Sequence, residues 1–241
     1  EIHYDGDLPA RSGIGSSSVF VVGLMNLLKT YMNKKINEKN LAKQSIHFEQ
    51  KVLKEVVGSQ DQVAASFGGF NKILFRTNGD FNVNNLNIKK NTLKKLNKNL
   101  LLIYTGIKRN AHDIAKSYVN KLHSSKKNNI LRIISYVDEC EKILKNNNID
   151  DFGKLLHESW LEKKDLNSSV SNRKIDEIYN YAIKNGALGG KVLGAGGGGF
   201  ILFYVPVEKQ KVLLKNFKKL INVPFNFSNE GSSIIFNNRN K

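Results

Sequence analysis

The sequence is short of cysteine and of long apolar runs, and each shortage excludes a class of protein. The single cysteine among 241 residues, Cys140, allows no intrachain disulfide and excludes a small secreted fold held by disulfides. Its spacing from Val137 and Leu144 predicts a buried helix position and not a nucleophile. No apolar run approaches the ~20 residues that span a bilayer, so no membrane partner is expected. With 40% apolar residues, we expect a cytoplasmic enzyme or binding protein of one large domain or two modest ones.

Acidic residues are also scarce. The chain has 38 lysines and arginines against 21 aspartates and glutamates, a formal net charge of +17. Such a balance raises the hypothesis of a polyanionic partner. The lysines, however, are scattered and interleaved with asparagine, as at residues 126–129 and 145–148. No helix-turn-helix, zinc ligand set or aromatic RNA-binding signature accompanies them, so we expect a basic surface and no nucleic-acid partner.

The periodicity of apolar residues predicts a mixture of helices and strands. Helices are expected at residues 16–32, 37–53, 61–67, 109–123, 129–144, 150–163, 172–184 and 207–220. Strands are expected at residues 1–7, 71–75, 81–88, 100–104, 200–205 and 232–236. The stretch 129–144 has the clearest amphipathic pattern. Without a steady βαβ alternation the class is α+β, and the turn at residues 77–80 predicts domains at 1–78 and 79–241.

The first motif that carries chemistry is a glycine and serine loop at residues 8–18. Gly13 and Gly15 allow positive φ and a close approach of the backbone to a ligand. Three serines follow where a helix begins, so free N–H groups and the positive end of the helix dipole favour an anion. It is not a Walker A loop, since no Gly-Lys-Ser/Thr follows. The alternative is an ordinary helix capped by serine.

The second motif is the polar turn Gly-Ser-Gln-Asp-Gln at residues 58–62. Asp61 has the chemistry to orient and deprotonate an attacking hydroxyl. The alternative is that Asp61 is a helix N-cap. Glu49, twelve residues earlier on the preceding predicted helix, is the candidate carboxylate for a metal ion, and its alternative is a solvated position on that helix.

The third motif, at residues 194–199, contains five glycines. Its spacing formally matches G-x-G-x-x-G, but it runs into an apolar strand at residues 200–205 instead of opening a helix. The dinucleotide-binding interpretation therefore fails on context. So many glycines still indicate a backbone pressed against a ligand or against another loop.

Together and in this order, the three motifs resemble the GHMP kinases, the superfamily of galactokinase, homoserine kinase and mevalonate kinase. The pattern P-x-x-x-G-x-G-S-S at residues 9–17 resembles the family's phosphate-binding second motif, and residues 194–199 resemble its third. Residues 57–71, 104–109, 156–160 and 186–196 are similar to the members that act on D-glycero-D-manno-heptose 7-phosphate, with fucokinase domains as relatives.

The resemblance implies a two-domain α+β fold, with an incomplete N-terminal domain like ribosomal S5 domain 2 and a ferredoxin-like C-terminal domain. It implies ATP and Mg²⁺ as cofactors and phosphoryl transfer to the anomeric hydroxyl, giving the 1,7-bisphosphate for nucleotide-activated heptose and surface glycans. Asp61 is implied as the catalytic residue, and Ser17 and Glu49 as metal ligands.

The resemblance also implies binding residues. Those implied at the nucleotide are Pro9, Arg11, Ser12, Gly13, Ile14, Gly15, Ser16, Ser17 and Ser18. Those implied at the sugar are Gln60, Arg109, Gly196 and Gly197. The cations that could bind the substrate's phosphate are Arg109, Lys163, Lys164, Arg173 and Lys191.

One departure concerns the family's first motif, which is expected before Pro9 and is absent from the sequence. The chain is then a fragment, or a partner chain supplies the motif, and a homodimer is a further expectation. The alternatives to a heptose kinase are a kinase similar to fucokinase or galactokinase, and an inactive fragment that binds nucleotide.

Overall fold

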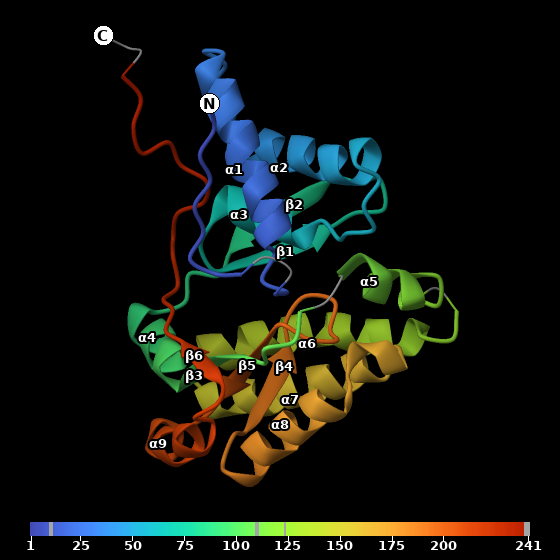
Figure 1. Ribbon diagram of the computed structural model, residues 1–241, viewed down its shortest axis with the longest axis vertical. Helices are drawn as coiled ribbons and strands as arrows, with labels where there is room; N and C mark the ends of the chain where they lie inside the picture. The colour runs from blue at the N-terminus through green and yellow to red at the C-terminus, as the bar shows by residue number, and fades with distance from the viewer. Residues whose placement is uncertain (10–11, 109–110, 123, 239–241) are drawn as a thin grey trace. The chain divides into compact units, whose positions relative to one another are not determined.

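A computed structural model of the chain describes residues 1–9, 12–108, 111–122 and 124–238 (Figure 1). The chain divides into two compact units, which are described separately below. The large unit comprises Glu1–Ile14 and Ile88–Asn226, and the small unit comprises Gly15–Asn87 and Phe227–Lys241. No helix in the described part of the chain combines the length and apolarity needed to cross a membrane.

The small unit consists of helices and one β-hairpin. Its elements are α1 (Ser16–Tyr31), α2 (Glu38–His47), a π-helical turn η1 (Phe48–Val52), α3 (Gln60–Phe67), β1 (Asn71–Phe75) and β2 (Phe81–Asn85). Ala42, Val63 and Phe81 form its buried core, and Phe67 packs edge-on against Phe81 with ring centroids 6.3 Å apart. Apolar contact therefore joins α2 and α3 to the hairpin.

The hairpin explains where the small unit ends. β1 and β2 pair antiparallel from Asn71 opposite Asn85 to Phe75 opposite Phe81. Their turn is closed by a hydrogen bond of 2.8 Å from the N–H of Arg76 to the carbonyl of Asp80. The turn from which the sequence predicts a domain boundary is thus the tip of a hairpin, and the chain passes from the small unit to the large unit after it, between residues 87 and 88.

Two expected terminal strands are wrong. Residues 1–7 form no strand, and the side chains of Ile2 and Tyr4 are exposed. Residues 232–236 are also irregular, because the N–H of Ser232 bonds to the carbonyl of Ala65 at 2.8 Å, on a helix and not on a strand. Beyond this contact Ile235 is 97% exposed. Alternating apolar residues cannot form a strand without a neighbouring strand to supply hydrogen bonds.

The large unit has one antiparallel sheet with strand order β4-β5-β3-β6 (Figure 1). Its strands are β3 (Leu100–Tyr104), β4 (Gly189–Val192), β5 (Phe200–Tyr204) and β6 (Ile221–Val223). Its helices are α4 (Lys90–Asn99), α5 (Ala111–Val119), α6 (Lys127–Lys145), α7 (Ile149–Lys164), the 3₁₀ turn η2 (Ser168–Val170), α8 (Arg173–Lys184) and α9 (Val207–Asn216). Trp160 of α7 and Phe203 of β5 lie in its main apolar core.

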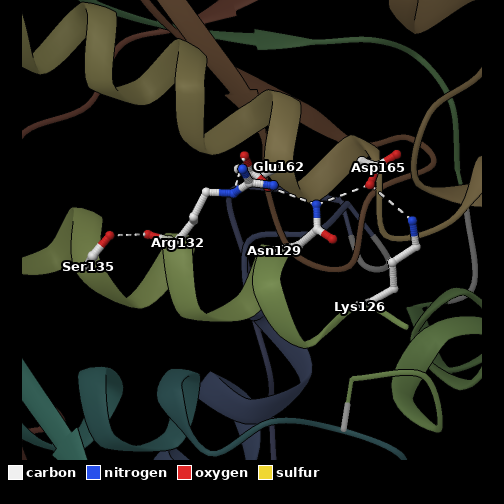
Figure 2. A network of polar contacts seen from close by, with 6 residues as sticks. All are labelled: Lys126, Asn129, Arg132, Ser135, Glu162 and Asp165. Carbon is white, nitrogen blue, oxygen red and sulfur yellow. Dashed lines mark hydrogen bonds and ion pairs between the residues drawn. The ribbon is translucent and has the colours of Figure 1, made fainter. Parts of the chain in front are cut away.

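A polar network joins α6 to α7 (Figure 2). The buried amide of Asn129 donates to Glu162 at 2.7 Å and to Asp165 at 3.1 Å. Lys126 pairs with Asp165 at 3.0 Å, and Arg132 pairs with Glu162 at 2.8 Å.

The amphipathic pattern at residues 129–144 therefore predicts the helix correctly but not all of its buried face. Leu144 is buried, whereas Ile134 is 58% exposed and Val137 is exposed as well. Cys140 is only partly buried, and burial raises the pKa of its thiol to about 11. A thiol with such a pKa is a poor nucleophile at neutral pH.

Candidate active site

The phosphate-loop motif leads into α1 through a left-handed residue. Gly15 is the N-cap with φ of 74°, and no side chain caps the first turn. The alternative of a serine-capped helix is therefore not what the structure has. Ser17 is exposed, while Ser18 lies on the buried face of α1 with Val21 and Val22. The uncapped first turn leaves backbone N–H groups available to an anion.

Asp61 lies against this turn. It is the second residue of α3, whose N-cap is Ser59, so Asp61 is not a helix N-cap. A Cβ atom built on Gly15 would be 3.0 Å from the Cγ and Oδ2 atoms of Asp61. Burial raises the pKa of Asp61, and a hydrogen bond with the side chain of Gln60 acts in the opposite direction. Gly15 is thus required both for its φ and for the approach of this carboxyl group.

Glu49 is buried in the small unit and is not a solvated position. Only 1% of it is exposed, within the π-helical turn η1. The hydroxyl of Ser18 donates to its Oε1 at 3.1 Å, and the amide Nε2 of Gln62 donates to its Oε2. In the described residues no cation pairs with this carboxylate. A buried carboxylate with only neutral donors is costly unless a cation or a proton joins it.

Gln60, predicted at the sugar, is exposed and borders a cavity of the small unit. The cavity has a volume of about 290 Å³ and is lined also by Ser59, Arg76, Asp80 and Phe81. The hairpin turn therefore forms one wall of this cavity and the start of α3 forms another.

The glycine-rich loop of the large unit is pressed against other segments of the same unit. A Cβ on Gly199 would lie 1.8 Å from the carbonyl oxygen of Ser12, and the N–H of Phe200 donates to that oxygen at 3.0 Å. A Cβ on Gly196 would lie 2.6 Å from the carbonyl of Val170. The Cβ atom of Gly197 would be 2.3 Å from the side chain of Ile114. Packing within the protein accounts for these glycines.

Ser12 itself is buried at the point where the two glycine motifs meet. It is 1% exposed, and its hydroxyl has no hydrogen-bond partner among the described residues. The adjacent Gly13 has φ of 86°. An unsatisfied buried hydroxyl beside a predicted phosphate loop is free to bond to a ligand.

The candidate phosphate-binding cations differ in the hydrogen bonds and ion pairs that they form. Lys163 is buried and donates to the carbonyls of Val192, at 3.0 Å, and of Gly194. Lys164 pairs with Asp176 at 2.8 Å, and Arg173 pairs with Glu177 at 2.8 Å. Lys191 donates to the hydroxyl of Ser159 at 3.2 Å, and burial lowers its pKa.

The structure divides the predicted site residues between the two units. Pro9, Ser12, Gly13, Ile14, Gly196 and Gly197 belong to the large unit, and Gly15, Ser16, Ser17, Ser18, Glu49, Gln60 and Asp61 belong to the small unit. Arg11 and Arg109 lie outside the described residues. The structure adds Gln62, which contacts Glu49, and it gives Lys163 contacts with the start of the glycine-rich loop. The sequence signal for Gln62 is a polar residue on the buried face of α3.

Comparison with known proteins identifies the family. Residues 1–69 match the GHMP kinases N terminal domain and residues 140–221 match the GHMP kinases C terminal domain. The chain is 35% identical over 233 residues to D-glycero-alpha-D-manno-heptose 7-phosphate kinase of Campylobacter jejuni, covering 95% of this chain and 69% of that protein. It is 28% identical to mevalonate kinase of Methanocaldococcus jannaschii, covering 91% of this chain and 66% of the relative.

Comparison with solved structures supports the same family. A D-glycero-D-manno-heptose 1-phosphate kinase from Bacteroides thetaiotaomicron superposes with a TM-score of 0.71 at 26% identity, covering 93% of this chain and 64% of that one. The chain thus spans about two thirds of the length of its relatives. The α+β class and the resemblance found in the motifs are confirmed, and the chain belongs to the GHMP kinase family.

Proposed function

We propose that this chain forms most of an ATP-dependent kinase that phosphorylates the anomeric hydroxyl of D-glycero-D-manno-heptose 7-phosphate. The product would be the 1,7-bisphosphate, an intermediate toward nucleotide-activated heptose for surface glycans. The observation that carries the proposal is the 35% identity, over 95% of this chain, to a heptose 7-phosphate kinase. The substrate-linked motifs at residues 57–71 and 186–196 support the same sugar.

Asp61 is proposed as the general base. Its carboxyl group lies at the start of α3 against Gly15, next to the uncapped first turn of α1. It would orient the anomeric hydroxyl and accept its proton while the N–H groups of α1 bind phosphate oxygens. Phosphoryl transfer depends mainly on such positioning and electrostatic stabilisation.

The residues of the small unit fit a magnesium ion. Mg²⁺ prefers oxygen ligands, and the buried carboxylate of Glu49 and the serines at the start of α1 supply them. No cluster of three or more His, Cys, Asp or Glu side chains occurs in the described ranges. Glu49 is therefore the proposed charged ligand, and the hydroxyl of Ser17 is proposed as a neutral ligand beside it. When bound, the ion would neutralise negative charge on the transferred phosphoryl group. Ser18 and Gln62 would meanwhile hold the Glu49 carboxylate in one orientation.

A coupled ADP-release assay with MgATP and D-glycero-D-manno-heptose 7-phosphate tests the proposal. It should compare this chain with a polypeptide of the full length of its relatives, and each with its Asp61→Asn variant. We expect turnover that Asp61→Asn lowers by about 10²–10⁴-fold. Turnover of fucose or galactose alone would assign a different sugar. ATP binding without transfer to any sugar, in either length of chain, would support the inactive fragment.

A further inference from the structure

Gln62 is a polar residue at a fully buried position, where a polar side chain is unfavourable unless it is hydrogen-bonded. It is fully buried on the face of α3 that also carries Val63 and Ser66. Its Nε2 atom donates to Glu49, while its Oε1 atom has no hydrogen-bond partner within the described part of the chain. Half of a buried amide is thus left unsatisfied, which is unfavourable for folding.

The contact with Glu49 fixes which way the amide points. The opposite orientation would set the Oε1 atom against the carboxylate, with two acceptors facing each other. Each oxygen of Glu49 then has one neutral donor, Ser18 from α1 and Gln62 from α3. The carboxylate is therefore held from two helices without being neutralised by either.

We infer that Gln62 is a positioning residue that orients the Glu49 carboxylate for a divalent cation. The inference rests on the proposed function, in which Glu49 is the charged metal ligand. An amide suits the task because it donates to the carboxylate without adding charge, whereas a glutamate would repel it and a methionine would leave one oxygen without a donor. Hydrogen-bonded partners of a metal ligand typically affect metal affinity or activity by 10–100-fold.

The alternative is that Gln62 only fills space in the interface of α1, α2 and α3. Loss of its amide would then lower the stability of the small unit without a specific effect on metal binding. Gln50 offers a matched control in the same unit. Its Nε2 atom donates to the carbonyl of Val57 at 3.0 Å and to Ser59 at 3.2 Å, whereas the side-chain donors to the Glu49 carboxylate in the described residues are Ser18 and Gln62.

The experiment compares Gln62→Met with Gln50→Met in the full chain. Mn²⁺ serves as the probe, and the loss of its free electron paramagnetic resonance signal reports binding without any need for turnover. Magnesium activation curves at saturating ATP and sugar give a second readout. We expect Gln62→Met to weaken Mn²⁺ binding and raise the Mg²⁺ requirement by about 10–100-fold, with the KM for sugar unchanged. Gln50→Met should stay within about twofold of the wild-type metal affinity, because it leaves Glu49 fully hydrogen-bonded.

Equal Mn²⁺ affinity in the wild type and in folded Gln62→Met would overturn the inference. A Glu49→Gln variant that binds Mn²⁺ as tightly as the wild type would also overturn it. If Gln62→Met does not fold, Gln62→Asn replaces it, since the shorter amide keeps the polarity but not the reach. Metal binding that depends on Gln62, together with the absence of kinase activity in both this chain and a polypeptide of the full length of its relatives, would uphold this inference and refute the proposed function. The two can therefore fail separately.

Discussion

Replacing Gly199 by alanine tests the close packing of the two glycine motifs in the large unit. The new Cβ would lie 1.8 Å from the carbonyl oxygen of Ser12, where ordinary contacts begin at 3.4 Å. Both partners are backbone, so neither has a side chain that could rotate away. The residue also has φ of 79°, which alanine rarely adopts.

The cost can be worked from these features. Left-handed φ in a residue other than glycine costs about 1–3 kcal/mol. Overpacking typically adds about 1–3 kcal/mol. Separating the loops also breaks the bond of 3.0 Å from Phe200 to Ser12, worth about 1 kcal/mol. We expect the free energy of unfolding to fall by about 4 kcal/mol, a drop in Tm of roughly 8–16 °C for a chain of this size.

Two control variants separate the contributions. Gly79 has φ of 82° with nothing near its Cβ position, so Gly79→Ala measures the backbone cost alone. Gly23, in α1, has neither restriction, and Gly23→Ala should stabilise the helix by up to about 1 kcal/mol. Unfolding by heat and by urea, followed by circular dichroism, checks all three. If Gly199→Ala costs no more than Gly79→Ala, the contact with Ser12 does not constrain the loop.

Three further variants test other parts of the structure. Burial raises the pKa of Asp61 in the folded state. The protonated carboxyl group therefore contributes stability that is fully present below the ordinary pKa of about 3.9. This contribution is lost as the pH rises through the higher pKa of the folded state. Asp61→Asn should therefore be more stable than the wild type at pH 7, although its turnover is strongly reduced, with equal Tm values at pH 3; a lower Tm at pH 7 would contradict this. Asn129→Asp would place a third carboxylate beside Glu162 and Asp165. It should lower the free energy of unfolding by about 1–3 kcal/mol at pH 7 and by a smaller amount in acid. Identical urea unfolding curves for the variant and the wild type would refute the network. Lys163→Met would leave two carbonyls unpaired and should cost about 1–3 kcal/mol, and an unchanged Tm would show that Lys163 does not hold the glycine-rich loop.

The parts of the fold that the sequence predicts are those with strong local signals. The glycine before a run of serines predicts the start of α1, and the apolar run at residues 100–104 predicts β3 at the observed bounds. Helix α4 is missed because only Thr92 and Leu96 of its ten residues are buried, which leaves a weak pattern. Strand β4 is missed because Gly189 and Gly190, which disfavour strands, are required by the closeness of α7 and Phe203.

The candidate site was predictable in its charged groups and not in their support. Asp61 and Glu49 are polar residues in a recognisable motif order, so the family pattern leads to both. The sequence has no information on which serine reaches Glu49, because Ser17 and Ser18 differ only by the rotation of one helical residue. Gln62 lies within the motif at residues 58–62, but the sequence does not show its contact with Glu49, because that partner is thirteen residues away on another element.

The small unit retains an arrangement that stability alone would not favour. A carboxylate at Glu49 and an amide at Gln62 are buried together, and the amide oxygen is left without a partner. Apolar residues of similar size would pack there without these costs. Consecutive residues of α3 direct Asp61 toward Gly15 and Gln62 toward Glu49, so one helical turn carries the proposed base and supports the proposed metal ligand. Such local departures from good packing are expected at functional sites, and the cost of this one is explained if a cation binds the Glu49 carboxylate during phosphoryl transfer.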